Sequence, residues 1–217
     1  MSRRNLQLAA LVAGVAVIGT ACQIDIETGS GETVTETYDI SEFTELEVSS
    51  AFDVEVEIGD EASLVIDIEE DVLDRLEVEQ DGDRLRIGFD SGLFSISGPL
   101  EARITVTELT AIDFDGAVDA EIDGLDADQL DVTLSGASQV DASGSVGVLV
   151  IDADGASEAD FGNTSVERAE VDASGASRID VNGASEVRGQ ASGASSVDVS
   201  PDADNVNVTT SGASSVE

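Results

Sequence analysis

Carboxylate side chains recur in the second half of the chain at a regular spacing. They lie 18 to 20 residues apart, at Glu121, Asp141, Asp160, Asp180, Asp198 and Glu217. Carboxylate oxygens suit calcium, so a fold that stacks this column would make Asp141, Asp160, Asp180 and Asp198 candidate metal ligands. The competing interpretation is a solvated acidic face. The Gly-Gly-x-Gly-x-Asp repeat of calcium-binding β-rolls is absent from the sequence, which favours the solvated face.

Serine forms a second column, two residues after a recurring glycine. Its members are Ser138, Ser157, Ser177, Ser195 and Ser214, with Val118 at the equivalent place in the first repeat. A nucleophilic serine needs a base within hydrogen-bond reach, and the chain contains neither histidine nor lysine. We therefore expect these hydroxyls to satisfy backbone groups at a bend. Glycan cleavage by two carboxylates is the enzyme class that this composition permits.

Cys22, the only cysteine, closes an N-terminal export signal. Arg3 and Arg4 precede an apolar run over residues 8–18, which is short for a membrane span. Ala21-Cys22 then leads into a polar, acidic stretch, as at the acylated cysteine of a lipoprotein, although Gly19 replaces the usual leucine. Residues 2–6 (SRRNL) also resemble a twin-arginine motif, so that export route and the general secretory route both stay open.

A short phrase built on glycine sets the spacing of both columns. It reads Asp-Gly-Ala-Val once and then Ser- or Asp-Gly-Ala-Ser, with its glycines at Gly116, Gly136, Gly155, Gly175, Gly193 and Gly212. Apolar and polar residues alternate on both sides of each glycine, as in half-buried strands. A period near 20 is typical of solenoids. The repeats therefore predict a parallel β-helix, with equivalent residues of successive coils roughly 4.8 Å apart.

The remaining elements follow from turn residues and alternation. The eighth residue after each repeat glycine is a turn former (Gly124, Gly144, Asn163, Gly183 and Pro201), so each repeat is predicted as strand, Gly-Ala bend, strand and turn. Residues 33 to about 110 lack the period but alternate, and 76–79 with 85–89 predict a hairpin. Apolar spacing of 3.6 is absent, so we expect almost no helix beyond the leader. The predicted fold class is all-β, with a strand-rich N-terminal half before a β-solenoid of roughly 20-residue repeats.

The charge of the chain restricts its partners. The formal net charge is −38, from 47 acidic and 9 basic residues. A nucleic acid or an anionic lipid surface would be repelled. Disorder does not fit, because 41% of the residues are hydrophobic and alternate with the acids. We expect a folded, halophilic protein whose self-repulsion is screened by salt.

The order of the motifs resembles a known family. Tyr38 to Phe43 (YDISEF), Phe52 to Val56 (FDVEV), Leu73 to Leu76, Leu85 to Ile87 and then Gly-Ala-Ser repeats are similar to the head GIN domain of auto-transporter adhesins. The resemblance covers nearly all of the chain after the leader. It implies a β-helix-like fold in secreted or lipid-anchored envelope proteins, and it implies no catalytic residues. Family members usually continue for a further turn beyond the position of Glu217.

Together these observations predict three segments: a signal peptide at 1–21, a lipidated tether at 22–32 and a head GIN-like domain at 33–217, with the Gly-Ala-Ser solenoid at 110–217. We expect a non-catalytic, extracytoplasmic lipoprotein, held in the membrane through Cys22, that acts as an adhesin-like binding or structural module. No cofactor and no nucleic-acid partner are expected. The alternatives are an enzyme that acts on envelope polysaccharide through paired carboxylates and a calcium-binding acidic scaffold.

Overall fold

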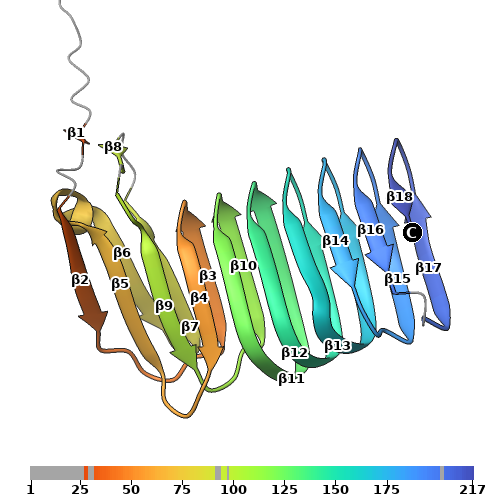
Figure 1. The fold of residues 1–217 in the computed structure, drawn as a ribbon, viewed down its shortest axis with the longest axis horizontal. Coiled ribbons are helices and arrows are strands. Elements are labelled where there is room, and N and C mark those ends of the chain that lie inside the picture. The colour runs from red at the N-terminus through yellow and green to blue at the C-terminus, as the bar shows by residue number, and fades with distance from the viewer. Residues whose placement is uncertain (1–26, 29–31, 91–93, 97, 201–202) are drawn as a thin grey trace, which may run out of the picture.

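The computed structural model describes residues 27–28, 32–90, 94–96, 98–200 and 203–217. The protein is almost entirely β, as predicted, and two layers of strands face each other across one core (Figure 1). Within the described residues, the only helix is the short 3₁₀ segment η1 (Glu70–Arg75). The signal peptide, Cys22 and most of the predicted tether lie outside the described residues, whereas β1 (Glu27–Thr28) pairs in parallel with β8 (Phe94–Ser95).

Each coil of the solenoid contributes one strand to each layer. The inbound layer contains the strands that lead into the Gly-Ala bend. In spatial order these are β6 (Leu76–Asp81), β7 (Arg84–Phe89), β3 (Glu45–Ser50), β10 (Ala111–Gly116), the second halves of β11 (Asp119–Gly136), β12 (Gln139–Ala153) and β13 (Glu158–Ala173), then β15 (Glu186–Ala191) and β17 (Asn205–Thr210).

The outbound layer contains the strands that leave the bend. Its order is β2 (Thr33–Tyr38), β5 (Ser63–Glu69), β9 (Glu101–Val106), β4 (Asp53–Ile58), the first halves of β11, β12 and β13, then β14 (Arg178–Val181), β16 (Ser196–Val199) and β18 (Ser215–Val216). All pairings within the solenoid are parallel. The antiparallel pairs β2/β5, β5/β9 and β6/β7 lie at the N-terminal end.

The alternation of apolar and polar residues in the sequence correctly predicts which side chains face the core. Ile112 and Phe114 in β10, and Ala159 and Phe161 in β13, are at most 2% exposed, while the residues between them face outward. The predicted hairpin is confirmed: β6 and β7 pair around Gly82, which has a φ of 63°. The apolar columns thus form one continuous core between the layers.

The solenoid starts earlier in the chain than the repeats at 110–217 suggest. Ser50 lies beside Gly116 in the stack, and β3 and β4 are in register with β10 and β11. The first coil is therefore formed by residues 45–58 and is separated from the second by the segment that forms β5 to β9. Ser50 keeps a φ of 90° with a side chain present, because no Gly-Ala bend precedes it in the stack.

The turn predicted on the far side of the coil is present at Gly183, where β14 ends at Val181, but it is wrong for three earlier coils. Strands β11, β12 and β13 continue through it, and the pairing register shifts by one residue there, between Ile122 and Leu125 in β11 and between Asp141 and Ser143 in β12. The shift absorbs the difference between coils of 19 and 20 residues. A β-bulge bends a strand without ending it, so a turn-forming residue did not mark a strand end.

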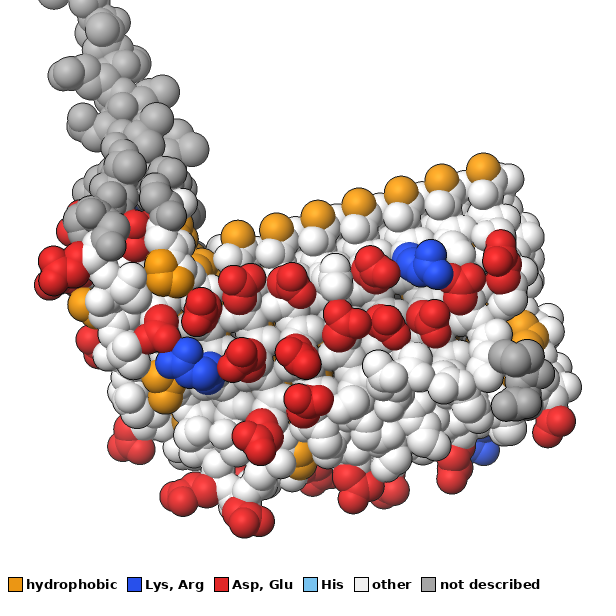
Figure 2. Space-filling model, in the orientation of Figure 1, with side chains coloured by type: hydrophobic (Ala, Val, Ile, Leu, Met, Phe, Trp, Pro, Cys, Tyr) orange, Lys and Arg blue, Asp and Glu red, His pale blue; other side chains and the backbone are white. Residues whose placement is uncertain are grey.

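The Gly-Ala bend brings successive coils into close contact. Gly193 has a φ of 77°, and a Cβ on it would lie 2.5 Å from the carbonyl oxygen of Gly175 in the preceding coil. The next N–H, that of Ala194, donates a hydrogen bond of 2.7 Å to the same oxygen. The methyl groups of the following alanines are exposed, and Figure 2 shows a straight row of apolar side chains along one edge of the molecule.

We predict that Gly193→Ala destabilises the fold more than Gly82→Ala. Both glycines have a left-handed φ, but nothing lies within 4 Å of a Cβ built on Gly82. Gly82→Ala should therefore cost only the backbone strain, about 1–2 kcal/mol. Gly193→Ala should add the overlap with Gly175 and cost about 2 kcal/mol more. Chemical denaturation measures both, and equal losses would contradict the steric role of the bend glycine.

Candidate binding surface

The predicted acidic column exists and is longer than the sequence indicated. In the outbound layer Glu121 lies beside Asp141, Asp141 beside Asp160, Asp160 beside Asp180, and Asp180 beside Asp198. On the other side of Glu121 the column continues to Glu55 in β4 and then to Arg103 in β9. Figure 2 shows rows of acidic side chains along this face. Sequence reasoning missed Glu55, because the inserted segment hides the period that would have aligned it.

Two arginines interrupt the negative charge of this face. Arg178 forms an ion pair with Asp198 and lies 3.9 Å from Glu158. Arg103 lies 2.7 Å from Asp67 and 3.6 Å from Glu101. The column therefore carries a cation near each of its ends.

The electrostatic consequence of this stacking is seen at Asp180, on the same strand as Arg178. Burial raises the pKa of Asp180 above its ordinary value, and the charges of Asp160 and Asp198 raise it further, while Arg178 acts in the opposite direction. Desolvation and like charges both disfavour an ionised carboxylate. In the inbound layer the pKa of Asp113 is raised in the same way, by burial and then by Glu47 and Asp115. Both groups oppose folding when they are ionised.

Three members of the column accept hydrogen bonds from donors on their own strand. The side-chain amide of Gln139 donates to Asp141 at 3.0 Å, the backbone N–H of Gly162 donates to Asp160 at 2.8 Å, and the hydroxyl of Ser196 donates to Asp198 at 3.4 Å. The described residues contain no group of three or more acidic side chains arranged to hold a metal ion. This arrangement gives the calcium alternative no support.

The serine column has the structural role that the sequence suggested. Ser138, Ser157, Ser177 and Ser195 are at most 2% exposed. Each donates its hydroxyl to the backbone carbonyl three residues earlier, as do Ser177 to Ser174 at 2.8 Å and Ser195 to Ser192 at 2.7 Å. The hydroxyls therefore hold the bend together and point into the protein, away from any substrate.

The inbound layer carries a second polar column, directly before the bend glycines, that sequence reasoning did not single out. Asp154 accepts hydrogen bonds from the hydroxyl of Ser174 at 2.6 Å and from the N–H of Gly155 at 2.7 Å. These two bonds lower the pKa of Asp154, with the serine as the larger cause. Ser135 donates to Asp115 in the same way. The alternation of aspartate and serine at this position in the repeats was the signal that could have revealed the column.

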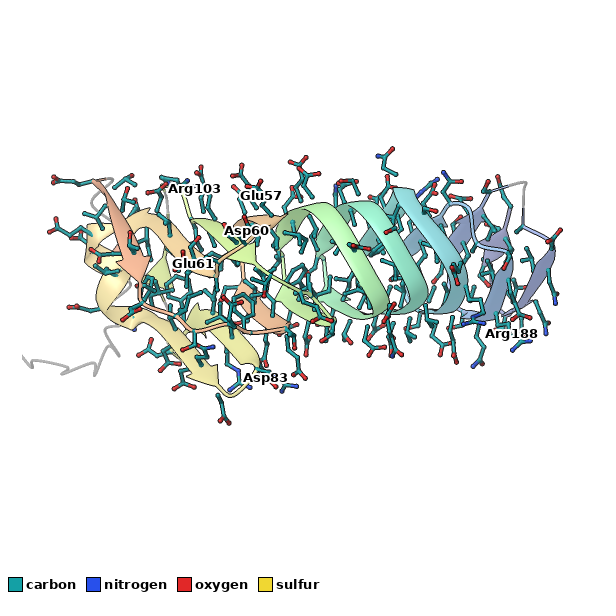
Figure 3. All side chains as sticks on the ribbon, turned by 90° about the horizontal axis from the view of Figure 1, so that it is seen from below. Glu57, Asp60, Glu61, Asp83, Arg103 and Arg188 are labelled. Atoms are coloured by element: carbon teal, nitrogen blue, oxygen red, sulfur yellow. The ribbon has the colours of Figure 1, made fainter. Side chains whose placement is uncertain are left out.

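A shallow hollow of about 610 Å³ lies beside Arg103, where β4, β5, β9 and β11 meet. Its polar lining includes Glu55, Glu57, Glu121 and Asp123, and no aromatic side chain lines it. Figure 3 shows Arg103, Glu57, Asp60 and Glu61 at this end of the molecule, on loops and strands of the N-terminal part. An aromatic platform of the kind that stacks on sugar rings is therefore missing from the hollow, which does not favour the polysaccharide-acting enzyme.

Comparison with known proteins identifies the family. Residues 42–203 match the sequence profile of the family described as "Putative auto-transporter adhesin, head GIN domain". The chain belongs to this family. No curated protein matches the chain. Among the described residues there is no helix long and apolar enough to cross a membrane.

Several solved structures share the fold. A "putative adhesin" from Bacteroides fragilis has a TM-score of 0.72 at 18% identity, and the match covers 87% of this chain and 98% of that one. A "putative adhesin" and a "putative lipid binding protein" from Parabacteroides distasonis have TM-scores of 0.53 and 0.52 at 13% and 17% identity. These matches cover 89% and 87% of this chain and 100% and 97% of the others. Membership in an adhesin family indicates a surface or extracytoplasmic protein.

We predict opposite effects from the same change at two aspartates. Because the pKa of Asp180 is raised, stability falls as pH rises through that pKa, and Asp180→Asn should stabilise the protein at pH 7 in dilute buffer. The side chain remains in contact with water, so the gain should stay below about 1 kcal/mol. The pKa of Asp154 is lowered, so its contribution is present above the ordinary pKa and is lost in acid.

Asp154→Asn should therefore lower the melting temperature at neutral pH and reduce the loss of stability in acid. Melting curves from pH 2.5 to pH 7 compare both variants with the original protein. Changes of the same sign at pH 7 would show that the hydrogen bonds to Asp154 and the repulsion at Asp180 do not govern these two positions.

Salt and calcium should act differently on the acidic face. Sodium chloride screens exposed charges to within about 3 Å at 1 M, so the melting temperature should rise with ionic strength. Millimolar calcium at fixed ionic strength should add nothing further, because the described residues offer it no cluster of ligands. A gain that is specific to calcium and grows with its free concentration would identify the column as a metal site. Indifference to salt would show that the repulsion is unimportant.

Proposed function

We propose that the protein is a non-catalytic, lipid-anchored adhesin-like module of the cell envelope. The observation that supports this most strongly is the match of three quarters of the chain to an adhesin family, together with a solenoid whose serine hydroxyls are used internally. The sequence adds an export signal that ends at Cys22, the proposed site of acylation.

The shape of the protein suits a module that presents its surface to other molecules and contacts them. A stack of coils that each touch only their neighbours gives a long, rigid body with extended faces. The outbound face presents carboxylates to solvent over the whole length of the stack, interrupted by Arg103 and Arg178. Such a face favours cationic or strongly hydrated envelope partners and disfavours nucleic acid. A high net charge also favours a salty surrounding, in which the repulsion between coils is screened.

We predict that Cys22→Ser separates the protein from the cell and abolishes attachment. The acyl group is the proposed anchor, so a processed variant that lacks it has no lipid to hold it in the membrane. The original protein should be found in the membrane fraction, and cells that carry it should attach to each other or to envelope material of the same organism. The variant should be released, or should remain as an uncleaved precursor, and its cells should not attach.

The matched control is Ser30→Ala, which changes a small polar residue of the predicted tether and leaves the cysteine intact. Membrane retention of the Cys22→Ser variant with unchanged mobility would contradict the anchor. Normal anchoring of the original protein without any gain in attachment would contradict the adhesive role.

A further inference from the structure

The chain contains two Asn-x-Ser/Thr sequons, at residues 163–165 (NTS) and 207–209 (NVT). This triplet is the acceptor of N-linked oligosaccharide in exported proteins. The sequence has three other asparagines, and none of them is followed by serine or threonine at the second position. Because the family indicates a surface or extracytoplasmic protein, both sequons are candidates for modification.

The first sequon lies in β13, at the far-side corner of its coil (the lower edge in Figure 1). Side chains two residues apart in a strand point to the same face. Asn163 and Ser165 are accordingly both exposed, while Thr164 between them is 1% exposed and donates its hydroxyl to the carbonyl of Ala142 at 2.8 Å. The strand therefore presents the acceptor amide and the hydroxyl of the sequon together at the surface.

The second sequon lies in β17 of the inbound layer, and its geometry is the same. Asn207 and Thr209 are exposed, and Val208 between them is half-buried against the core. In the stack Asn207 lies beside Arg188, which also faces outward. The outward direction is set by alternation, and a coil stacks beside an outward side chain and not over it.

The asparagines of the sequons differ from two others in their hydrogen bonds. The side-chain amide of Asn182 donates to a backbone carbonyl of the preceding coil at 2.8 Å, and that of Asn205 donates to Glu186 at 3.4 Å. Within the part of the chain that the structure describes, the side chains of Asn163 and Asn207 form no hydrogen bond, and neither do the hydroxyls two residues later. A substituent on either amide would therefore break no contact of the fold.

The corner next to Asn163 also leaves room for a bulky group. Between its pairings with β14 and β15, strand β13 runs through residues 162–167, whereas the next coil crosses the corner with only 182–185. A Cβ built on Gly183 in this shorter segment would lie 3.8 Å from its nearest neighbour. At Gly144, two corners earlier, it would lie 2.2 Å from a backbone oxygen of the preceding coil. The side of Asn163 that faces the next coil is thus loosely covered.

We propose that Asn163 and Asn207 each carry an N-linked oligosaccharide. The donor is an oligosaccharide linked through phosphate to a membrane lipid. In the transfer, Nδ2 of the asparagine forms a bond to C1 of the first sugar, the bond between C1 and the phosphate oxygen breaks, and the lipid phosphate leaves. The amide gives up one proton to a base of the transferase, and no oxidant or reductant is needed.

The two attachment points leave the outbound face uncovered. Asn207 belongs to the inbound layer, and Asn163 lies at the corner, beyond the residues of β13 that pair in the outbound layer. An oligosaccharide is bulky and solubilising. At these positions it would cover the inbound face and the corner and leave the outbound carboxylates accessible to a partner.

Mass spectrometry of the native protein tests the two sites separately. The protein is purified in detergent from membranes of the organism that makes it and is cleaved after arginine. Residues 104–168 then form a peptide with Asn163 as its only asparagine, and the peptide that follows Arg188 contains Asn205 and Asn207. Both peptides should carry the mass of an oligosaccharide, which fragmentation should locate on Asn163 and Asn207.

Variants at the hydroxyl residue show whether the sequon directs the modification. Thr209→Val removes the hydroxyl, keeps the shape of the side chain and should abolish the sugar on Asn207. Thr209→Ser keeps a hydroxyl and should keep the sugar. The matched control is Asn205→Gln, which changes an exposed asparagine of the same strand outside the sequon and should leave the sugar in place. Ser165→Ala and Ser165→Thr form the same pair for Asn163.

Each site stands or falls by its own peptide. An unmodified Asn207 in the original protein, or sugar that persists on it in Thr209→Val, overturns the proposal for that site, and the equivalent results at Asn163 overturn it there. Sugar found only on serine or threonine hydroxyls overturns both. Melting temperatures show whether each variant is folded. The proposal rests on export, which the proposed function shares, but on neither the acyl anchor nor adhesion. Unmodified asparagines on protein from the membrane fraction would therefore contradict the glycans alone.

Discussion

Close approach of successive coils at the Gly-Ala bend is the constraint on which the rest of the structure depends. Each bend residue has a left-handed φ, and each carbonyl there accepts a hydrogen bond from the N–H of the next coil. A Cβ from Gly136 onward would overlap the preceding coil, so only glycine permits the spacing. With the bends fixed in this way, every other position of the repeat falls into a straight column.

In-register stacking has an electrostatic consequence that the protein must manage. Equivalent carboxylates come to lie one strand spacing apart, and burial followed by the charges of Asp160 and Asp198 raises the pKa of Asp180. Local donors such as Gln139 and the N–H of Gly162, and the ion pair of Arg178, offset part of it. The regular stacking that aligns the core residues thus also aligns the carboxylates. The stability of the fold therefore depends on screening of their charges by salt.

The N-terminal end of the stack is covered for a related reason. A solenoid coil is stable only when a neighbour covers it, and the N-terminal end meets this need with antiparallel strands and η1, where Val72 is fully buried. In the last described coil Val206 is 44% exposed.

The sequence by itself determined the class of fold, the direction of the core columns and the structural use of the serines. Each of these depends on residues close in sequence, since alternation decides which side chain faces inward and glycine decides where the chain bends. It also placed Glu121, Asp141, Asp160, Asp180 and Asp198 in one column, because a constant period converts directly into spatial neighbours.

Only the tertiary structure decided what lies beside that column and where the solenoid begins. Ser50 replaces the bend glycine, and the insertion that forms β5 to β9 separates the first coil from the second, so no local pattern could align Glu55 with Glu121 or bring Arg103 next to them. The bulges after Ile122 and Asp141 were hidden for a similar reason: a strand that bends needs the same turn residues as a strand that ends. Whether it continues depends on the hydrogen bonds that the neighbouring coil offers.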